Sequence, residues 1–211
     1  LTSGGENTGR LDMDQFVQIA DAEKIEADAL NELFEAIQEK FNNTVKSMID
    51  IGVNLADKSF DRDRLEVLKR ANIAGVKKIV ITGSCDDSNL KASHLAAKNP
   101  GFLYSTAGVH PHYASSFNDG SIGIIKKLSK EKSIVAIGEC GLDYYRNLSP
   151  REIQIKVFTQ QLTIAKESCL PVFLHQRNAH EDFVKILKPY INNLKKIVVH
   201  CFTGNADELH E

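Results

Sequence analysis

Six side chains able to bind a metal ion follow four separate apolar runs of the sequence. In chain order they are His110, His112, Glu139, Asp143, His175 and His200. Neutral imidazoles and carboxylates suit Mg²⁺, Mn²⁺ or Zn²⁺, with coordination positions left open for water and substrate. A divalent metal held in this way can activate water near neutral pH and polarise a phosphoryl or carbonyl oxygen. The residue types therefore predict metal-dependent hydrolysis.

Three of these residues are the strongest candidates for metal ligands. We expect Glu139, His175 and His200 to hold the ion. A single histidine of this kind is more often a half-buried structural residue at a strand end than a ligand. Three separate runs that deliver ligand-type residues to one rim reverse that expectation, because barrel enzymes assemble their sites in this way.

The runs that carry these residues alternate with helical patterns from Met48 onward. The runs are Met48–Val53, Lys78–Ile81, Phe102–Val109, Ile134–Gly138, Pro171–Leu174 and Ile197–Val199. Each is rich in Val, Ile, Leu or Phe without polar alternation, which predicts strands buried on both faces. The helical patterns are Asp61–Ala74, Asp86–Lys98, Ser121–Lys130, Arg151–Glu167 and Ala179–Pro189. Such alternation predicts parallel strands joined by right-handed crossovers.

Two α/β folds have this alternation, the doubly wound sheet and the eight-stranded barrel. Six units, with no glycine-rich phosphate loop after the first run, favour a TIM-type (β/α) barrel that is incomplete at its C-terminal end. Every polar cluster follows a run, including Asn54 after the first and Gly83 and Ser84 after the second. In a parallel barrel these ends share one mouth, so we expect the polar residues to converge there.

Composition sets limits on partners and compartment. The 211 residues, 42% of them hydrophobic, can form one domain or one and a half, and the net charge of -2 gives no global field that attracts nucleic acid. Any contact with nucleic acid must then be local. The cysteines form no CxxC pair, and no apolar segment indicates secretion or a membrane span. We therefore expect a cytoplasmic protein with no membrane contact and no obligate protein partner.

The sequence divides near residue 47. Residues 1–47 are acidic and predict a short extension with a helix from about Ala22 to Phe41, whose apolar residues fall on one face. Residues 48–211 contain all the runs and all the candidate ligands. We expect them to form the hydrolase barrel, with about six strand–helix units.

Five segments of the second part carry a family resemblance. They are Ile49–Leu55, Thr106–His112, Ala136–Asp143, Pro171–Arg177 and Val199–Gly204. In this order they resemble the successive signatures of the TatD family of metal-dependent deoxyribonucleases, and the Gly-Glu-Cys-Gly-Leu-Asp segment is highly specific beside the other four. The resemblance covers Met48 to the end of the chain. It implies a TIM-type barrel, one or two divalent metals, and hydrolysis of DNA phosphodiester bonds, commonly from the 3′ end.

The resemblance also implies roles for single residues. By it, Glu139, His175 and His200 are metal ligands, and His110 lies near the scissile phosphate, where it can stabilise the transition-state charge. Glu139 and His110 are then the catalytic residues. Mg²⁺ is the favoured metal, with Mn²⁺ and Zn²⁺ as alternatives.

The sequence departs from the family pattern at two places. Many relatives have a His-x-His pair on the first strand, where this chain has Gly52 and Asn54, as does the branch of the family that it most resembles. One metal position must therefore be weak or differently built. The family's later aspartate and the strands that close the barrel would lie beyond Glu211. We therefore expect this chain to be a fragment of a longer functional protein, and its activity alone is uncertain.

Five further polar residues are expected at the barrel mouth. Asn54, His112 and Arg177 are candidates for substrate binding. Arg177 can clamp a phosphate oxygen with paired hydrogen bonds, with a structural salt bridge as an equal alternative, and His112 can equally be a solvated loop residue. Asp143 is expected to order the loop after the fourth run. Asp50 is either a hydrogen-bond partner of a ligand or a ligand at the outer rim.

Together these features predict an enzyme that cleaves DNA, a 3′-5′ exodeoxyribonuclease in DNA repair or degradation. One alternative keeps the metal and changes the bond, as in an amidohydrolase that acts on an amide or lactone. Another is a catalytically inactive relative or fragment that uses the barrel mouth only for binding. Metal-dependent cleavage lost on Glu139→Ala separates both enzymes from the binding protein, and the choice of substrate separates the two enzymes.

Overall fold

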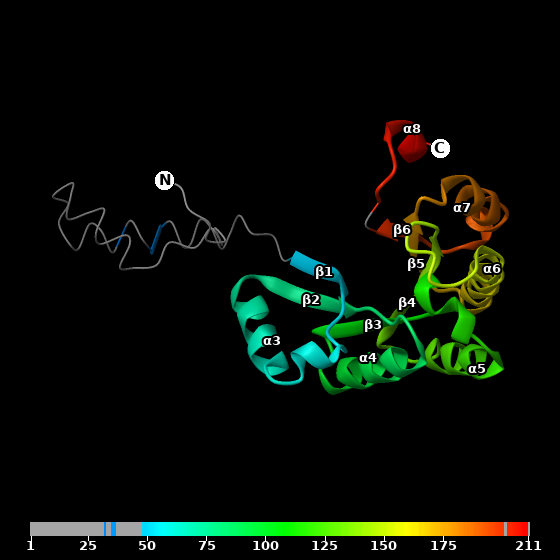
Figure 1. The fold of residues 1–211 in the computed structure, drawn as a ribbon. Coiled ribbons are helices and arrows are strands. Elements are labelled where there is room, and N and C mark those ends of the chain that lie inside the picture. Colours follow the sequence, from blue (N-terminus) through cyan, green and yellow to red (C-terminus); the bar gives the residue numbers. More distant parts are fainter. Residues whose placement is uncertain (1–31, 33–34, 37–47, 201, 211) are drawn as a thin grey trace. The chain divides into compact units, whose positions relative to one another are not determined.

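The computed structural model describes residues 32, 35–36, 48–200 and 202–210. Six strands form one parallel sheet in which each strand lies beside the next one in sequence (Figure 1). The strands are β1 (Met48–Val53), β2 (Val76–Ile81), β3 (Leu103–Ala107), β4 (Ile134–Asp143), β5 (Val172–Arg177) and β6 (Ile197–His200). Every expected apolar run therefore forms a strand.

A helix follows each strand before the next one begins. The α-helices are α3 (Arg64–Ile73), α4 (Asp86–Lys98), α5 (Asp119–Leu128), α6 (Arg151–Ser168), α7 (His180–Leu187) and α8 (Ala206–His210), and the 3-10 helices are η1 (Lys58–Phe60), η2 (Pro111–Ser116) and η3 (Lys188–Asn193). Parallel strands in sequential order with intervening helices are the repeating unit of a (β/α) barrel. The expected α/β fold, a TIM-type barrel incomplete in this chain, is confirmed.

The central strands extend further than their apolar runs. β4 continues past the expected end at Gly138 as far as Asp143, because Cys140 and the residues after it pair with β5. His175 likewise lies inside β5 and pairs with His200 of β6. Glu139 and Asp143 are therefore strand residues, which fixes their backbone in the sheet instead of a loop.

The first strand does not have the burial that its sequence predicts. Met48, Ile49 and Ile51 are 44%, 57% and 48% exposed, so the expectation of a strand buried on both faces is wrong for β1. β1 pairs only with β2 among the described strands. An apolar strand is buried only where neighbours cover its faces, and the described residues leave Met48–Ile51 exposed while Gly52 and Val53 are half-buried.

The core that supports the central strands is continuous. Side chains of β4 and β5, such as Ile137 and Leu174, pack against those of α5, α6 and α7. Phe158 of α6 is fully buried there and stacks on Phe183 of α7 with ring centroids 5.3 Å apart. A smaller cluster lies beneath β1 and β2, against α3 and α4. The larger cluster therefore holds the strands that carry Glu139 and His175.

Two expectations concern the N-terminal part and the membrane. The expected helix from Ala22 to Phe41 lies outside the described residues except for Glu32, Glu35 and Ala36, which are helical. None of the helices in the described part of the chain is long and apolar enough to cross a membrane.

Candidate metal centre

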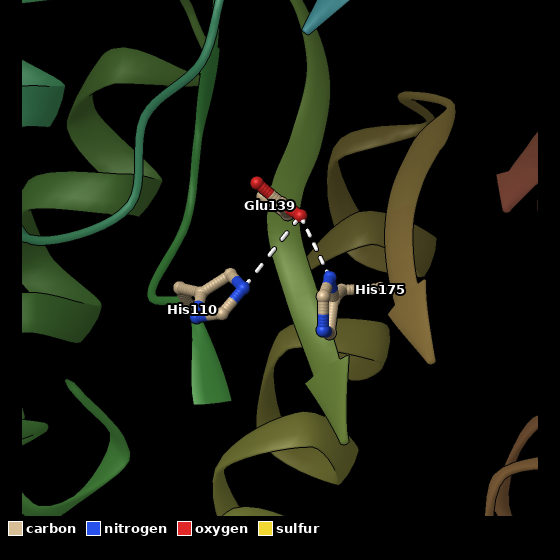
Figure 2. A group of neighbouring side chains, drawn as sticks. All are labelled: His110, Glu139 and His175. Atoms are coloured by element: carbon tan, nitrogen blue, oxygen red, sulfur yellow. Dashed lines mark hydrogen bonds and ion pairs between the residues drawn. The ribbon is translucent and has the colours of Figure 1, made fainter. Parts of the chain in front are cut away.

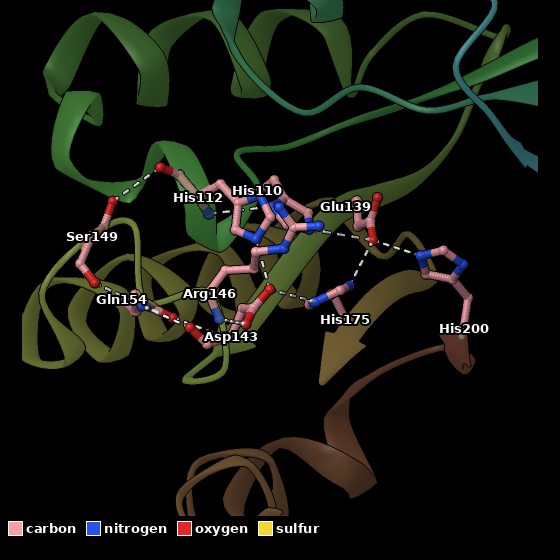
Figure 3. Close-up of polar contacts among 9 residues, drawn as sticks. All are labelled: His110, His112, Glu139, Asp143, Arg146, Ser149, Gln154, His175 and His200. Atoms are coloured by element: carbon pink, nitrogen blue, oxygen red, sulfur yellow. Dashed lines mark hydrogen bonds and ion pairs between the residues drawn. The ribbon is translucent and has the colours of Figure 1, made fainter. Parts of the chain in front are cut away.

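Three imidazoles from three different segments surround one carboxylate oxygen. The Oε1 atom of Glu139 lies 2.5 Å from Nε2 of His200, 3.1 Å from Nδ1 of His175 and 3.7 Å from Nε2 of His110. Figure 2 shows His110 and His175 on either side of Glu139, and Figure 3 adds His200. The convergence expected at the C-terminal ends of the strands therefore occurs.

The backbone of Glu139 is held by the segment that follows β2, two strands away in the sheet. Its N–H group donates to the carbonyl oxygen of Gly83, at 2.8 Å. The end of β3 lies so close to β4 that a Cβ atom on Gly108 would be 2.5 Å from Cα of Gly138. Only glycine allows two backbones to come so near each other. This close contact places the end of β3, and with it His110, against β4.

His110 is oriented by hydrogen bonds on its backbone and its ring. Its backbone N–H donates to the carbonyl oxygen of Ser84 at 2.9 Å, and its ring Nδ1 accepts from the backbone N–H of His112 at 3.2 Å. Because Nδ1 accepts, Nε2 carries the hydrogen in the neutral ring. Nε2 faces Glu139, so His110 presents a donor to the centre of the cluster.

His175 and His200 face the same carboxylate from β5 and β6. The ring of His200 stacks on Phe173 with centroids 4.6 Å apart. The second ring nitrogen of His175, Nε2, is buried without a hydrogen-bond partner among the described residues, and it lies 3.5 Å from Oδ2 of Asp143. A hydrogen on Nε2 would therefore face the carboxylate of Asp143 while Nδ1 faces Glu139.

Burial and charge set the protonation of the cluster. Burial lowers the pKa of His110 to about 4, against the opposing effect of Glu139, so the ring is neutral at pH 7. Burial alone would raise the pKa of Glu139, but hydrogen bonds from His175 and His200 bring it well below its usual range. An ionised carboxylate beside a neutral imidazole is the protonation state that metal binding requires.

The residues present fit a divalent metal ion. Ligand atoms of His110, Glu139 and His175 all lie within 4.8 Å of one another. Without a metal, His175 and His200 direct a hydrogen at the ionised Glu139, but each neutral ring can carry that hydrogen on its other nitrogen and leave the facing nitrogen free as a ligand. The Nδ1 atom of His110 accepts from the His112 backbone, which opposes the same change in that ring. One carboxylate and two imidazoles leave positions open for water and substrate, as in catalytic metal sites.

Asp143 forms a second set of contacts beside the cluster. Its Oδ2 atom lies 2.6 Å from Nε2 of His112, and its Oδ1 atom accepts from the backbone N–H of Arg146 at 2.8 Å (Figure 3). Burial alone would raise the pKa of Asp143, but these hydrogen bonds lower it overall. Asp143 therefore contacts both the backbone of the loop after β4 and the ring of His112.

Three expected site residues lie apart from the cluster. The guanidinium of Arg177 lies over the ring of Tyr145, 4.1 Å from its centroid, and it forms no ion pair with a carboxylate in the described part of the chain. Asn54 and Asp50 are exposed at β1. Neither side chain makes a hydrogen bond with the cluster among the residues that the structure describes.

Sequence reasoning missed several groups that hold the cluster. The carbonyl oxygens of Gly83 and Ser84 bind the backbones of Glu139 and His110. A backbone carbonyl has no signature in the sequence beyond its place at a strand end. Arg146 was also missed, because its role depends on its N–H group and not on its charge.

Comparisons with known proteins identify relatives of this chain. Residues 49–211 match the family described as TatD related DNase. The chain is 52% identical over 162 residues to the 3'-5' ssDNA/RNA exonuclease TatD of Yersinia pseudotuberculosis, an alignment that covers 77% of this chain and 62% of the relative. The chain therefore spans less than two thirds of the length of that curated relative.

Solved structures show the same similarity in three dimensions. A TatD homologue from Escherichia coli K12 aligns with a TM-score of 0.72 and 29% identity, over 79% of this chain and 64% of that one. A structure described as an uncharacterized amidohydrolase from Saccharomyces cerevisiae aligns with a TM-score of 0.68 and 28% identity, over 78% and 64%. From the family match and the level of identity, this chain belongs to the TatD related DNase family.

Proposed function

We propose that the protein is a metal-dependent nuclease that hydrolyses DNA phosphodiester bonds and releases nucleotides from the 3′ end of single strands, in DNA repair or degradation. The observation that carries the proposal is the convergence of His175 and His200 on one oxygen of Glu139. The name of the Yersinia relative, a 3'-5' ssDNA/RNA exonuclease, supports the choice of substrate and direction.

The proposed ligands of the metal are Glu139, His175 and His200. A divalent cation supplies a Lewis acid that activates water and offsets charge on a phosphate. Mg²⁺ is the proposed ion because the reaction is on a phosphodiester, and Mn²⁺ and Zn²⁺ are the alternatives because imidazole suits them. The ionised carboxylate of Glu139 between the rings of His175 and His200 supports a cation at this place.

His110 is proposed as a hydrogen-bond donor to the substrate. Its Nδ1 atom accepts from the His112 backbone, so Nε2 carries the hydrogen and faces the cluster. A donor fixed in this position can stabilise negative charge that develops on a phosphate oxygen in the transition state. Its neutral ring at pH 7 keeps that hydrogen in place without adding a buried charge.

Residues outside the three proposed ligands are proposed to hold the substrate. Arg177 has a guanidinium that no described carboxylate neutralises, so it is available for a phosphate oxygen. His112 extends from η2 beside His110, and Asp143 fixes its ring. Asn54 is proposed to contact the nucleic acid from the exposed end of β1. The proposal does not extend to Asp50, whose exposed carboxylate makes no contact among the described residues.

We also propose how the chain is divided, where the protein is located and what it binds. Residues 48–211 are proposed to be the hydrolase unit and residues 1–47 an acidic extension. A cytoplasmic location is proposed, supported by the free thiols of Cys85, Cys140 and Cys169. The nucleic acid is the proposed partner, bound locally because the net charge is -2.

Release of labelled nucleotides tests the proposed function. The intact protein is incubated with single-stranded DNA labelled at either end, with Mg²⁺, Mn²⁺ or a chelator. Glu139→Gln is the inactive variant and Glu66→Gln, an exposed residue of α3, is the matched control. We expect metal-dependent release from the 3′ end, lost in Glu139→Gln and retained in Glu66→Gln.

Two results would contradict the proposal. Cleavage that persists in Glu139→Gln would mean that another site does the chemistry. A protein that binds Mn²⁺ at this centre and yet cleaves no DNA would favour an amidohydrolase, the activity in the name of the Saccharomyces neighbour. The next assay would then measure hydrolysis of an amide or a lactone by that protein instead of cleavage of DNA.

A further inference from the structure

Of the four carboxamide side chains that are buried in the described part of the chain, three bind both the N–H and the carbonyl group of a backbone residue beside the metal centre. Asn89 of α4 and Gln161 of α6 are 0% exposed, and Gln154 of α6 is 1% exposed. Burial of an amide without hydrogen bonds is costly, so each must be paired within the protein. All three pair with the backbone of a segment that carries a site residue.

Gln161 binds the residue that precedes His110. Its Oε1 atom accepts from the backbone N–H of Val109 at 2.7 Å, and its Nε2 atom donates to the carbonyl oxygen of Val109 at 3.0 Å. The side-chain amide therefore satisfies both backbone groups of one residue. His110 is the next residue along the chain.

Asn89 binds Gly108, the residue before Val109, in the same way. The backbone N–H of Gly108 donates to Oδ1 of Asn89 at 3.0 Å, and Nδ2 of Asn89 donates to the carbonyl oxygen of Gly108 at 2.9 Å. The pairing of β3 with β4 ends at Ala107. The two residues that lead from β3 to His110 are thus held by side-chain amides where the sheet no longer holds them.

Gln154 repeats the arrangement at the end of β4. Its Oε1 atom accepts from the backbone N–H of Asp143 at 2.8 Å, and its Nε2 atom donates to the carbonyl oxygens of Asp143 at 3.2 Å and Ser149 at 2.7 Å (Figure 3). Asp143 in turn contacts His112 and lies 3.5 Å from His175. Gln154 and Gln161 are seven residues apart, which places both on one face of α6.

We propose that Asn89, Gln154 and Gln161 are positioning residues that hold the imidazoles of the metal centre indirectly. They bind the backbones of Gly108, Asp143 and Val109, beside the histidines, through N–H and carbonyl groups that no described strand pairs with. A carboxamide is suited to this task because it offers a donor and an acceptor with the spacing of a peptide group. An apolar side chain of the same size would leave two buried backbone groups unpaired. The inference rests on the proposed function only in naming the cluster a metal centre.

Histidine NMR of the intact protein without metal tests the proposal, since it reports ring positions whether or not a metal binds. Gln161→Met removes both hydrogen bonds to Val109 at nearly constant volume, and Gln154→Met does the same at Asp143. Leu162→Ala is the control, because Leu162 is fully buried on the same helix and belongs to the apolar core.

We expect each variant to change its own set of ring signals. Gln161→Met shifts or broadens the signals of His110, and Gln154→Met those of His112 and His175, while the exposed His94 keeps its signals in both. Leu162→Ala lowers the melting temperature without moving any of these signals. If Gln161→Met does not fold, Gln161→Glu, which keeps the acceptor for the Val109 N–H, replaces it.

The proposal is overturned if a folded Gln161→Met or Gln161→Glu protein keeps the wild-type signals of His110, or if Leu162→Ala moves them equally. Titration with Mn²⁺ gives a second readout. We expect the affinity for Mn²⁺ to fall about 10-fold or more in both Met variants, as it does when residues that orient metal ligands are replaced. We expect it to stay constant in Leu162→Ala. A wild-type protein that binds no Mn²⁺ would contradict the proposed function, while the ring signals would still decide the positioning role.

Discussion

β1 and β4 are both apolar parallel strands with acidic residues in them, and only β4 contributes to the metal centre. β4 lies between β3 and β5, and nearly all of its residues are buried. β1 has one partner strand among those described and is largely exposed. Glu139 of β4 is therefore fixed among three imidazoles, whereas Asp50 of β1 projects from an uncovered strand. A ligand is positioned by the packing on both sides of its strand as well as by its place at the strand end.

The strongest test of this difference replaces one carboxylate in each strand. Glu139→Gln is expected to abolish Mn²⁺ binding, because it removes the one anionic ligand that the described residues give to the cluster while keeping the size of the side chain. Asp50→Asn is expected to leave Mn²⁺ affinity unchanged. Isothermal titration with Mn²⁺ measures both. Equal losses in the two variants would show that β1 takes part in the centre after all.

The two regions should also differ in their contribution to stability. Phe158→Ala empties a fully buried position beneath the central strands and is expected to cost about 3–5 kcal/mol of unfolding free energy. Leu65→Ala, on α3 beside β2, changes a side chain that is 71% exposed and is expected to cost less than about 0.5 kcal/mol. Urea unfolding gives both values. Similar costs would mean that the core is not concentrated beneath β4 and β5.

Acid should weaken the central region through His110. Burial lowers the pKa of His110 to about 4 from 6.5, so between these values the unfolded chain binds a proton that the folded chain does not. Stability is therefore lost as the pH falls from 6.5 to 4, by on the order of 3 kcal/mol. Unfolding of His110→Asn and wild type, both without metal, is compared across this range. The variant should lose less stability than wild type, and an identical pH dependence would contradict the account.

A smaller effect is expected from the support that Asp143 gives to its neighbours. Asp143→Asn keeps the shape of the side chain but removes the charge that pairs with His112 and faces His175. We expect Mn²⁺ affinity to fall about 10- to 100-fold, as for other partners of ligating residues. The exposed Asp87→Asn on α4, which breaks only a surface ion pair with Lys91, is the control and should bind Mn²⁺ normally. If Asp143→Asn binds Mn²⁺ with wild-type affinity, Asp143 does not support the metal ligands and only orders the loop after β4.

The alternation of apolar runs and helical patterns was enough to predict the strands, their parallel order and the edge where Glu139, His175 and His200 meet. It was not enough to predict that β4 continues through Asp143, because Gly141 and its neighbours become strand only by pairing with β5. The exposure of β1 was missed for a similar reason, since burial depends on neighbours that an apolar run does not specify. The orientation of His110 depends on a backbone N–H two residues later, which has no signature in side-chain types.

The buried amides of α6 have a signature in the sequence. Gln154 and Gln161 interrupt the face of α6 that otherwise carries buried side chains such as Phe158 and Leu162. A glutamine on such a face must find a partner for both ends of its amide. The sequence could therefore have indicated a buried hydrogen bond at each position, although not which backbone it binds.

The most direct test of the account is the position of a bound metal in a crystal of the intact protein grown with Mn²⁺. The account predicts an anomalous scattering peak in contact with Glu139, His175 and His200, with His110 directing Nε2 toward the open side of the ion. No peak at this place, or a peak held by other residues while Glu139 keeps its hydrogen bonds to the histidines, would contradict the assignment of the cluster as a metal centre.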